Sequence, residues 1–231
     1  EMNERSQKYY QELLLLREMQ LDTGDLIVAS TAMRNIVEMV THVAQFDSTC
    51  LILGESGVGK DVIARLIHSK SNRRKNPFVK INCGAIPRDL LEAEMFGYDP
   101  GAFTGARKEG KPGMFEIAHT GTLFMDEVGE FPLDLQVKLL QVIQDRTVYR
   151  VGGTKPIEVD VRIVAATNRN LEQMVQAGKF REDLYYRLNI IPIEIPPLRT
   201  RPEDILPLVE MNLRQLNKRY GKNKKLSPEV I

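Results

Sequence analysis

Residues 49–61 read TCLILGESGVGKD. The apolar run 49–53 predicts a buried strand, and the spacing of Val62, Ile63, Leu66 and Ile67 predicts a helix over residues 61–70. Residues 54–60, between them, fit the phosphate-binding pattern G-x-x-x-x-G-K in the strand–loop–helix context that the pattern requires. Glycines let such a loop curl with its N–H groups inward, and the start of a helix favours an anionic phosphate.

These residues predict a site for ATP in which Lys60 reaches the β- and γ-phosphates. The expected contacts are Gly54, Glu55, Ser56, Gly57, Val58, Gly59, Lys60 and Asp61. Asp61 departs from the general pattern, which has Ser or Thr at this position to hold Mg²⁺. Either its carboxylate acts there, for example through water, or the metal relies on the phosphates and Asp126.

Strands and helices alternate along the rest of the chain. Further strands are predicted at 78–82, 122–125, 159–167 and 190–195, and a helix at 135–143. Strands separated by helices indicate an α/β fold, a parallel sheet with helices on both faces.

The composition changes at Pro196-Pro197-Leu198, after which residues 202–220 read as a helix. Ser227-Pro228-Glu229 reads as the start of another helix. We therefore expect an α/β domain over 25–198 and the start of a small helical lid, incomplete in this chain, over 199–231. Residues 1–24 precede them, and 1–20 read as a helix that is either a linker from an upstream domain or a packed terminal helix.

Composition excludes several classes of protein. The 231 residues carry a net charge of +1, which does not suit a chain that as a whole binds polyanions. No apolar run is long enough to span a membrane and the N-terminus lacks a signal pattern, so the cytoplasm is expected. Cys50 and Cys83 are expected to be buried reduced thiols, and the basic runs 73–75 and 222–225 to be solvated surface turns.

Polar residues follow the apolar strands. Asp126 and Glu127 end the run LFM, where Asp126 would organise Mg²⁺ and Glu127 would act as the general base for the attacking water. Asn168 follows the strand 159–167 and suits a sensor of the γ-phosphate or the water. Asn82 ends the strand FVKIN and could restrain Glu127.

Between the second and third of these strands lies GAFTGA: Gly101, Ala102, Phe103, Thr104, Gly105 and Ala106. With GESGVGKD, FVKINCGAI, GTLFMDEVGE, FREDLYYRLN and PPLRTRPEDI in the same order, the chain from about residue 25 onward resembles the AAA+ ATPase domain of sigma-54-dependent transcription activators, the bacterial enhancer-binding proteins. The resemblance implies an ATPase that remodels the sigma-54 RNA polymerase holoenzyme, works as a hexamer-like ring, and binds DNA through a domain absent from this chain.

The resemblance also implies residue roles. Phe103 and Thr104 are similar to the loop tip that contacts the sigma factor, and residues 146–156 to a second loop that moves with it. Asn82 resembles the asparagine that pairs with Glu127. Ile27 and Val28 match the adenine-side segment, although the family commonly has glycine at the position of Val28, and Glu rather than Asp61.

Arg181 and Arg187 resemble arginines offered to the nucleotide of a neighbouring subunit. Six residues turn a helix through about 600°, so the two arginines cannot share one narrow face of a helix. We favour Arg187 as the arginine finger, the residue that contacts the neighbouring subunit's nucleotide. Two other classes stay open: a different AAA+ remodeller such as a helicase or clamp loader, which DNA-stimulated ATPase activity would reveal, and a nucleotide switch that does not hydrolyse ATP, which a phosphate-release assay would reveal.

Overall fold

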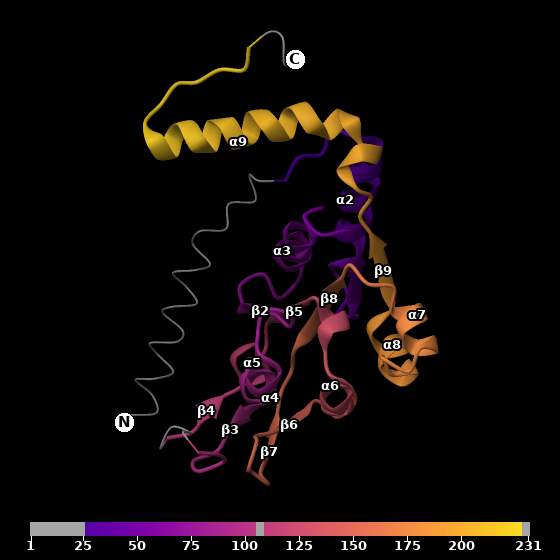
Figure 1. The fold of residues 1–231 in the computed structure, drawn as a ribbon, viewed down its shortest axis with the longest axis vertical. Helices are drawn as coiled ribbons and strands as arrows, with labels where there is room; N and C mark the ends of the chain where they lie inside the picture. The colour runs from indigo at the N-terminus through magenta and orange to yellow at the C-terminus, as the bar shows by residue number, and fades with distance from the viewer. Residues whose placement is uncertain (1–25, 105–108, 228–231) are drawn as a thin grey trace.

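The computed structural model of the chain describes residues 26–104 and 109–227. Figure 1 shows a central sheet with helices around it, two small strand pairs at one end and helix α9 at the other. No helix within the described residues has the length and apolar character needed to cross a membrane. The helix predicted over 1–20, Gly105, Ala106, Pro228 and Glu229 lie outside the described residues.

Five parallel strands form the main sheet in the order β2-β5-β8-β1-β9. They are β1 (Cys50–Leu53), β2 (Phe78–Asn82), β5 (Thr122–Asp126), β8 (Arg162–Thr167) and β9 (Ile191–Glu194). The predicted parallel α/β fold is confirmed. After β1 the chain builds one side of the sheet and later returns to add β9 on the other, and ligands of such sheets bind at the carboxyl ends of the strands beside this reversal.

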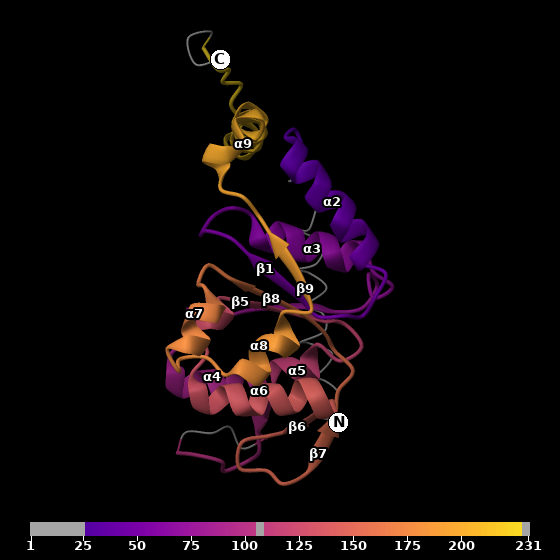
Figure 2. The same ribbon diagram turned by 90° about the vertical axis from the view of Figure 1, so that its right-hand side faces the viewer.

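Helices cover both faces of the sheet (Figure 2). Alternate strand residues point to opposite faces: Ile52 and Phe124 pack in the core beneath α2 and α3, whereas Leu51 and Met125 pack in the core beneath the other helices. The helices of the two layers are α2 (Thr31–Val43), α3 (Lys60–Lys70), α4 (Arg88–Phe96), α5 (Met114–Ile117), α6 (Leu133–Asp145), α7 (Leu171–Gln176) and α8 (Glu182–Leu188).

Two short antiparallel pairs project from the sheet. Strands β3 (Gly97–Tyr98) and β4 (Lys111–Pro112) flank the GAFTGA sequence, and β6 (Thr147–Tyr149) pairs with β7 (Pro156–Glu158). A 3₁₀ turn, η2 (Val128–Glu130), follows β5. The loop between β6 and β7 coincides with the second loop expected from the sequence.

The chain leaves the sheet through two 3₁₀ turns, η3 (Leu198–Thr200) and η4 (Pro202–Asp204), and then forms α9 (Ile205–Tyr220). No residue of α9 is buried, and the helix extends across the top of Figure 1, away from the sheet. The lid expected from residue 199 onward stays a prediction.

Two predictions on local structure are wrong. The strand predicted from residue 159 begins only at Arg162, because the preceding residues pair with β6 or connect the two strands. Arg73 is not a solvated turn residue: its side chain is 11% exposed and its guanidinium binds Asp47 at 2.9 Å and Asp160 at 2.8 Å.

Both cysteines are buried and free, as predicted. Burial raises the pKa of the Cys50 thiol. Burial, aided by the charges of Asp126 and Glu127, raises the pKa of Cys83 to about 12. Each sulfur is therefore a protonated core atom at neutral pH.

Candidate nucleotide site and the GAFTGA loop

Lys60 begins α3 and turns its ammonium group into the phosphate loop. Its Nζ donates to the carbonyl oxygens of Gly54 and Glu55, both at 2.9 Å. Gly57 (φ 81°) and Gly59 (φ 101°) have left-handed backbone that a residue with a side chain rarely adopts. No side chain caps α3, so the first N–H groups of the helix remain available to an anion. Loop, lysine and helix start together suit a bound phosphate.

The carboxyl ends of four strands bring the predicted polar residues to the phosphate loop. Asn82 lies opposite Asp126 in the β2–β5 ladder, and the Cys83 N–H donates to the Asp126 carbonyl at 2.9 Å. The Gly54 N–H donates to the carbonyl of Thr167 at 3.3 Å, and exposed Asn168 follows directly. The structure therefore places Asn82, Asp126 and Asn168 at the same edge as the loop.

Glu127 lies between Asp126 and the turn η2 with a left-handed backbone, φ 56°. Its carboxylate reaches the turn after β2, where a Cβ added to Gly84 would come 2.2 Å from Glu127 Oε2. The Asn82 Oδ1 accepts from the N–H groups of Gly84 and Ala85, both at 2.9 Å. Asn82 and Glu127 thus approach the same turn, but no hydrogen bond joins them in this state of the described chain.

Lys80 brings a second positive charge to this edge. Its Nζ lies 3.7 Å from Asp61 Oδ2 and 3.9 Å from Asp126 Oδ2, above the ring of Phe124. Lys80 is not part of any motif in the sequence, although its position two residues before Asn82 puts both on one face of β2. The carboxylates of Asp61 and Asp126 thus both lie within 4 Å of the Lys80 ammonium.

The two carboxylates fit a magnesium ion, because Mg²⁺ prefers oxygen ligands and is usually bound by one or two carboxylates together with phosphates and water. Asp126 is 17% exposed and Asp61 is more open, so both can reach a bound ligand. No group of three or more His, Cys, Asp or Glu side chains within the described ranges suits a metal by itself. Phosphates would have to complete this site.

The predicted adenine-side segment lies beside the core of α2 and α3. Val28 packs against this core and Ile27 is partly buried. The next residues, Ala29 and Ser30, are held by Asp204, which lies 175 and 174 residues later in the chain. No pattern in the sequence predicts this contact.

The two candidate arginines have different surroundings. Arg181 precedes α8 as its N-cap and binds Asp183 through Nε at 3.0 Å and a terminal nitrogen at 2.7 Å. Only Arg187 is in the helix, so the comparison of helical faces does not apply. Arg187 is exposed and has no hydrogen bond or ion pair within the part of the chain that the structure describes.

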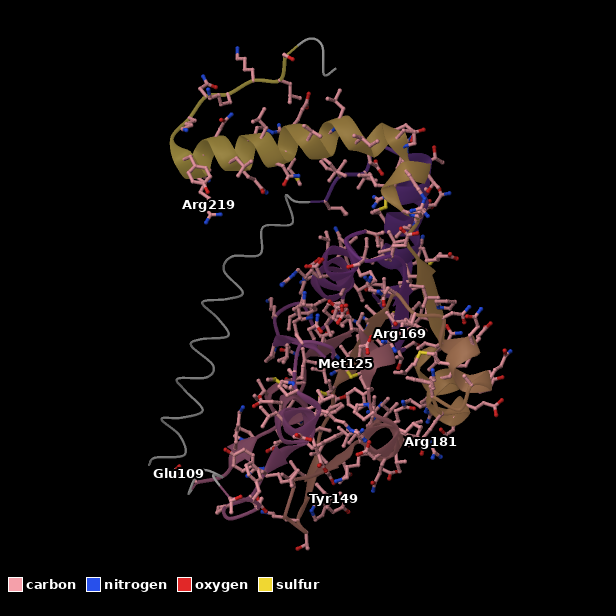
Figure 3. All side chains as sticks on the ribbon, in the orientation of Figure 1. Glu109, Met125, Tyr149, Arg169, Arg181 and Arg219 are labelled. Carbon is pink, nitrogen blue, oxygen red and sulfur yellow. The ribbon has the colours of Figure 1, made fainter. Side chains whose placement is uncertain are left out.

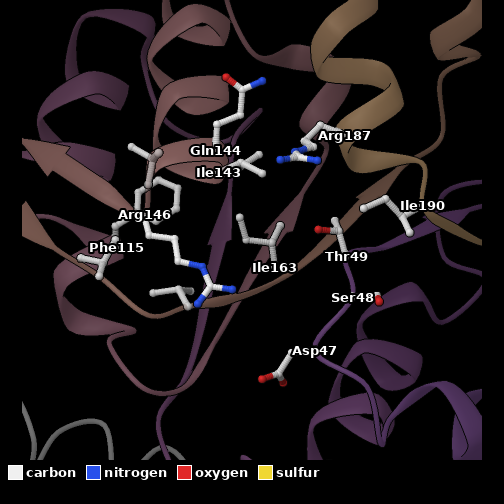
Figure 4. A pocket seen from close by; sticks show the side chains of 13 residues that line it. Asp47, Ser48, Thr49, Phe115, Ile143, Gln144, Arg146, Ile163, Arg187 and Ile190 are labelled. Atoms are coloured by element: carbon white, nitrogen blue, oxygen red, sulfur yellow. The ribbon is translucent and has the colours of Figure 1, made fainter.

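Arg187 lies at the opposite edge of the sheet from the phosphate loop. It lines a cavity of about 310 Å³ with Thr49, which precedes β1, and Ile190, which precedes β9. Figure 4 shows Arg187 and Arg146 extending over this hollow with Ile163 between them. Four residues of β1, about 13 Å at the usual rise per residue, separate this edge from the phosphate loop of the same chain.

The GAFTGA loop is attached to the second loop. The Asp99 N–H donates to the Val151 carbonyl at 3.0 Å, and the Val151 N–H donates to the Gly97 carbonyl at 2.9 Å. The Phe103 side chain is 42% exposed, and its ring meets the Tyr98 ring edge-on at 5.0 Å. In Figure 3, Glu109 and Tyr149, which flank the two loops, lie at one end of the molecule, far from Met125 beside the acidic pair.

Arg150 joins the two loops to the body of the domain. Its guanidinium donates to Glu116 of α5 at 2.9 and 2.7 Å and to Asp99 at 3.4 Å. Glu116 Oε1 also accepts from the Gly113 N–H at 3.1 Å. Arg150 lies in the segment predicted as the second loop, but its partners could not be read from the sequence.

Residues 26–194 match the protein family described as the sigma-54 interaction domain. This chain belongs to that family. The matched range contains the phosphate loop, the acidic pair and GAFTGA, and the fold is that of P-loop AAA+ domains. As a sigma-54 interaction domain, the chain has the architecture of an AAA+ ATPase domain.

Relatives with described roles resemble this sigma-54 interaction domain closely. It is 56% identical over 200 residues to the DNA-binding transcriptional activator HyfR of Escherichia coli (strain K12), an alignment that covers 87% of this chain and 30% of HyfR. It is 54% identical over 206 residues to a signal-transduction and transcriptional-control protein of Clostridium beijerinckii, covering 89% and 32%. The chain thus spans about a third of the length of these two curated relatives.

Solved structures have the same fold. The crystal structure of NtrX from Brucella abortus in complex with ATP superposes with a TM-score of 0.82 at 38% identity, covering 98% of this chain and 49% of that chain. The sigma-54 interaction domain of the present chain therefore has its fold in common with a protein that has been crystallised with ATP.

Proposed function

We propose that this domain hydrolyses ATP with Mg²⁺ and uses the cycle to remodel the sigma-54 RNA polymerase holoenzyme, so that promoter complexes open. The observation that carries the proposal is a phosphate cradle and a GAFTGA loop in one fold, linked by a single helix. Helix α4 begins shortly after the Asn82 turn and ends at Phe96, next to β3 and the loop. The described roles of HyfR and the Clostridium protein as transcriptional regulators support this assignment.

At the nucleotide, Lys60 and the loop N–H groups would hold the phosphates, and Asp126 with Asp61 would hold the metal. Bound Mg²⁺ would supply positive charge and orient the phosphate oxygens. Glu127 would accept the proton of the attacking water, and exposed Asn168 would contact the γ-phosphate or that water. The placement of Asp61 and Asp126 about Lys80 supports the metal assignment.

Coupling would begin at the turn after β2, which both Asn82 and Glu127 approach. A change of contacts there between the ATP and ADP states would move the start of α4, and Phe103 and Thr104 would respond at its other end. Coupling requires that the two states differ in these contacts, because equal binding to both shifts no equilibrium. Through its bonds to Asp99 and Glu116, Arg150 would make the second loop move together with the GAFTGA loop.

The active site would be shared between copies of the chain in a hexamer-like ring. Arg187, at the edge opposite the phosphate loop, has no ion pair or hydrogen bond among residues 26–104 and 109–227, which supports a contact with the nucleotide of a neighbour. Arg181, in contrast, is already bound to Asp183. An arginine supplied in this way can raise the rate by about 10³–10⁵ in other NTPases. We also propose that the protein works in the cytoplasm and that it binds DNA through a domain outside this chain.

The direct test separates hydrolysis from remodelling. Phe103→Ala and Thr104→Ala should keep at least about half of the ATPase rate and lose binding to sigma-54 and open-complex formation, because neither side chain lies at the phosphate loop. A roughly twofold limit corresponds to a change of about 0.4 kcal/mol, which is within the range of a surface substitution. ATPase, sigma-54 binding and promoter opening would be measured on the same preparations.

Phe46→Ala is the matched control, since Phe46 is another exposed phenylalanine, 65% exposed, outside both loops. It should retain all three activities. Normal promoter opening by Phe103→Ala and Thr104→Ala would contradict the proposal, and so would ATPase stimulation by DNA without any effect on sigma-54.

A further inference from the structure

A buried carboxylate connects the first segment of the described chain with the segment that leads into α9. Asp204 is fully buried, yet Oδ1 accepts from the N–H groups of Ala29 at 2.9 Å and Ser30 at 2.7 Å. Its Oδ2 accepts from Ser30 Oγ at 2.7 Å. Ser30 also caps α2, its Oγ accepting from the Met33 N–H at 3.2 Å.

Arg201 extends the same contact to the phosphate loop. Its guanidinium is buried and pairs with Asp204 at 3.4 Å. A second terminal nitrogen donates to the Val58 carbonyl at 2.9 Å, and Nε donates to the Pro196 carbonyl at 3.1 Å. Val58 lies between the two left-handed glycines of the loop, Gly57 and Gly59.

Asp204 keeps its charge in this setting. Burial by itself raises the pKa of its carboxyl, but the hydrogen bonds from Ser30 and Ala29 and the charge of Arg201 outweigh that effect and lower the pKa. A buried charge is tolerated only when it is paired and hydrogen-bonded, so removal of one partner disturbs the others. The Asp204–Arg201 pair therefore connects Ala29 and Ser30 to Val58 of the phosphate loop.

We infer that Asp204 and Arg201 are positioning residues for nucleotide binding. Asp204 holds residues 27–30 at the place of the base, and Arg201 holds the Val58 carbonyl of the phosphate loop. The inference rests on the proposed role of Ile27 and Val28 as the adenine-side segment. Its consequence is that the segment entering α9 positions the proposed adenine-side segment through Asp204 and the phosphate loop through Arg201.

The test compares a ligand that has a base with one that lacks it. Dissociation constants for ATP and for inorganic tripolyphosphate would be measured by calorimetry on the folded domain. Ser30→Ala should raise the constant for ATP about tenfold, the usual effect of losing a hydrogen bond to a charged group, and leave that for tripolyphosphate within about twofold. Asp204→Asn also leaves the buried Arg201 guanidinium without its charged partner, so both constants should rise. Arg201→Lys keeps the charge but not the fork, so both constants should rise about fivefold.

Ser30→Ala keeps the test informative if Asp204→Asn does not fold, because it removes a single hydroxyl. Asn170→Ala is its matched control: Asn170 caps α7 in the same way, with Oδ1 accepting from the Gln173 N–H at 3.0 Å, and does not touch residues 27–30. This control should bind both ligands normally while losing a similar amount of thermal stability.

Three outcomes would overturn the inference. One is an unchanged ATP constant in folded Ser30→Ala or Asp204→Asn, another is an equal loss of ATP and tripolyphosphate binding in Ser30→Ala, and the third is normal tripolyphosphate binding by Arg201→Lys. Val28→Trp distinguishes a failure of the positioning roles from a failure of the proposed adenine-side assignment. If Val28→Trp weakens ATP alone, only the positioning roles are wrong, whereas unchanged ATP binding by Val28→Trp removes the adenine assignment and the inference with it.

Discussion

Glu127 is held in a left-handed backbone conformation with its carboxylate against Gly84. Glu127→Gln keeps the shape of the side chain but cannot accept the proton of the attacking water. We expect ATP binding to remain and hydrolysis to slow by at least about 10²-fold, the usual contribution of a general base. Single-turnover phosphate release, with the ATP dissociation constant measured in parallel, checks this prediction.

Glu130→Gln is the control for Glu127→Gln. Glu130 also lies beside Gly84, but it pairs with Arg169. Its substitution should change hydrolysis little. If Glu127→Gln turned over ATP at a nearly normal rate, the base would have to be another group.

At the proposed metal site, the Lys80 ammonium lies near Asp61 and Asp126. A magnesium ion between these carboxylates would be repelled by this charge. Lys80→Met should therefore lower the Mg²⁺ concentration needed for half-maximal ATP binding by about two- to fivefold, as expected for a partly exposed charge pair. A magnesium titration of nucleotide binding measures the shift.

Lys80→Arg keeps the charge and should behave like the unchanged protein. An unaltered or higher magnesium requirement in Lys80→Met would show that Lys80 does not compete with the metal. Sequence patterns do not reveal such a role, because a lysine in a strand is usually solvated. Lys60, in contrast, belongs to the G-x-x-x-x-G-K pattern, which has a well-defined loop geometry.

At the scale of elements, His68 near the end of α3 contacts β5. Its Nδ1 lies 2.9 Å from Thr122 Oγ1, and burial, with the nearby charge of Arg162, lowers the pKa of the imidazole from 6.5 to about 4. Between these values an unfolded chain takes up a proton that the folded chain does not. The free energy of unfolding should therefore fall as the pH drops through this window, by about 2–3 kcal/mol.

Chemical denaturation at a series of pH values from 7 to 4 measures this loss. His68→Gln is the informative variant, since an amide can still bond to Thr122 but does not titrate. Its stability should vary less over the same pH range. An equal pH dependence in both proteins would assign the effect to other groups.

Periodicity predicted the five strands of the main sheet and the helices α3 and α6, because buried apolar residues recur there at the spacing of each element. It did not identify α4 or the short strands β3, β4, β6 and β7. Strands of two or three residues have no period to detect, and each exists only because its partner lies beside it. The predicted strand 159–167 was too long because residues 159–161 connect β7 to β8.

At the scale of the whole molecule, the nucleotide site and Arg187 lie at opposite edges of one sheet. Lys60→Ala and Arg187→Ala proteins should each be nearly inactive in ATP hydrolysis. When they are mixed, some interfaces join an intact cradle from the Arg187→Ala chain with an intact arginine from the Lys60→Ala chain. Partial recovery of the ATPase rate is therefore expected.

Mass measurement must show that the rings are mixed. Arg181→Ala serves as the comparison, because Arg181 is bound to Asp183 and is less available to a neighbour. Absence of recovery in mixed rings would contradict the assignment of Arg187. Recovery with Arg181→Ala in place of Arg187→Ala, and not with the latter, would move the finger to Arg181.

The amino-acid sequence by itself determined the phosphate loop, the acidic pair, the GAFTGA loop and the parallel α/β class, because each depends on residues that are close in the chain. Only the tertiary structure brought Asp204 to Ser30, Lys80 to Asp61, and Arg187 to the edge opposite Lys60. These contacts join segments that are far apart in sequence. Their geometry follows from strand order and from the packing of helices on the sheet, and neither leaves a local pattern of residues.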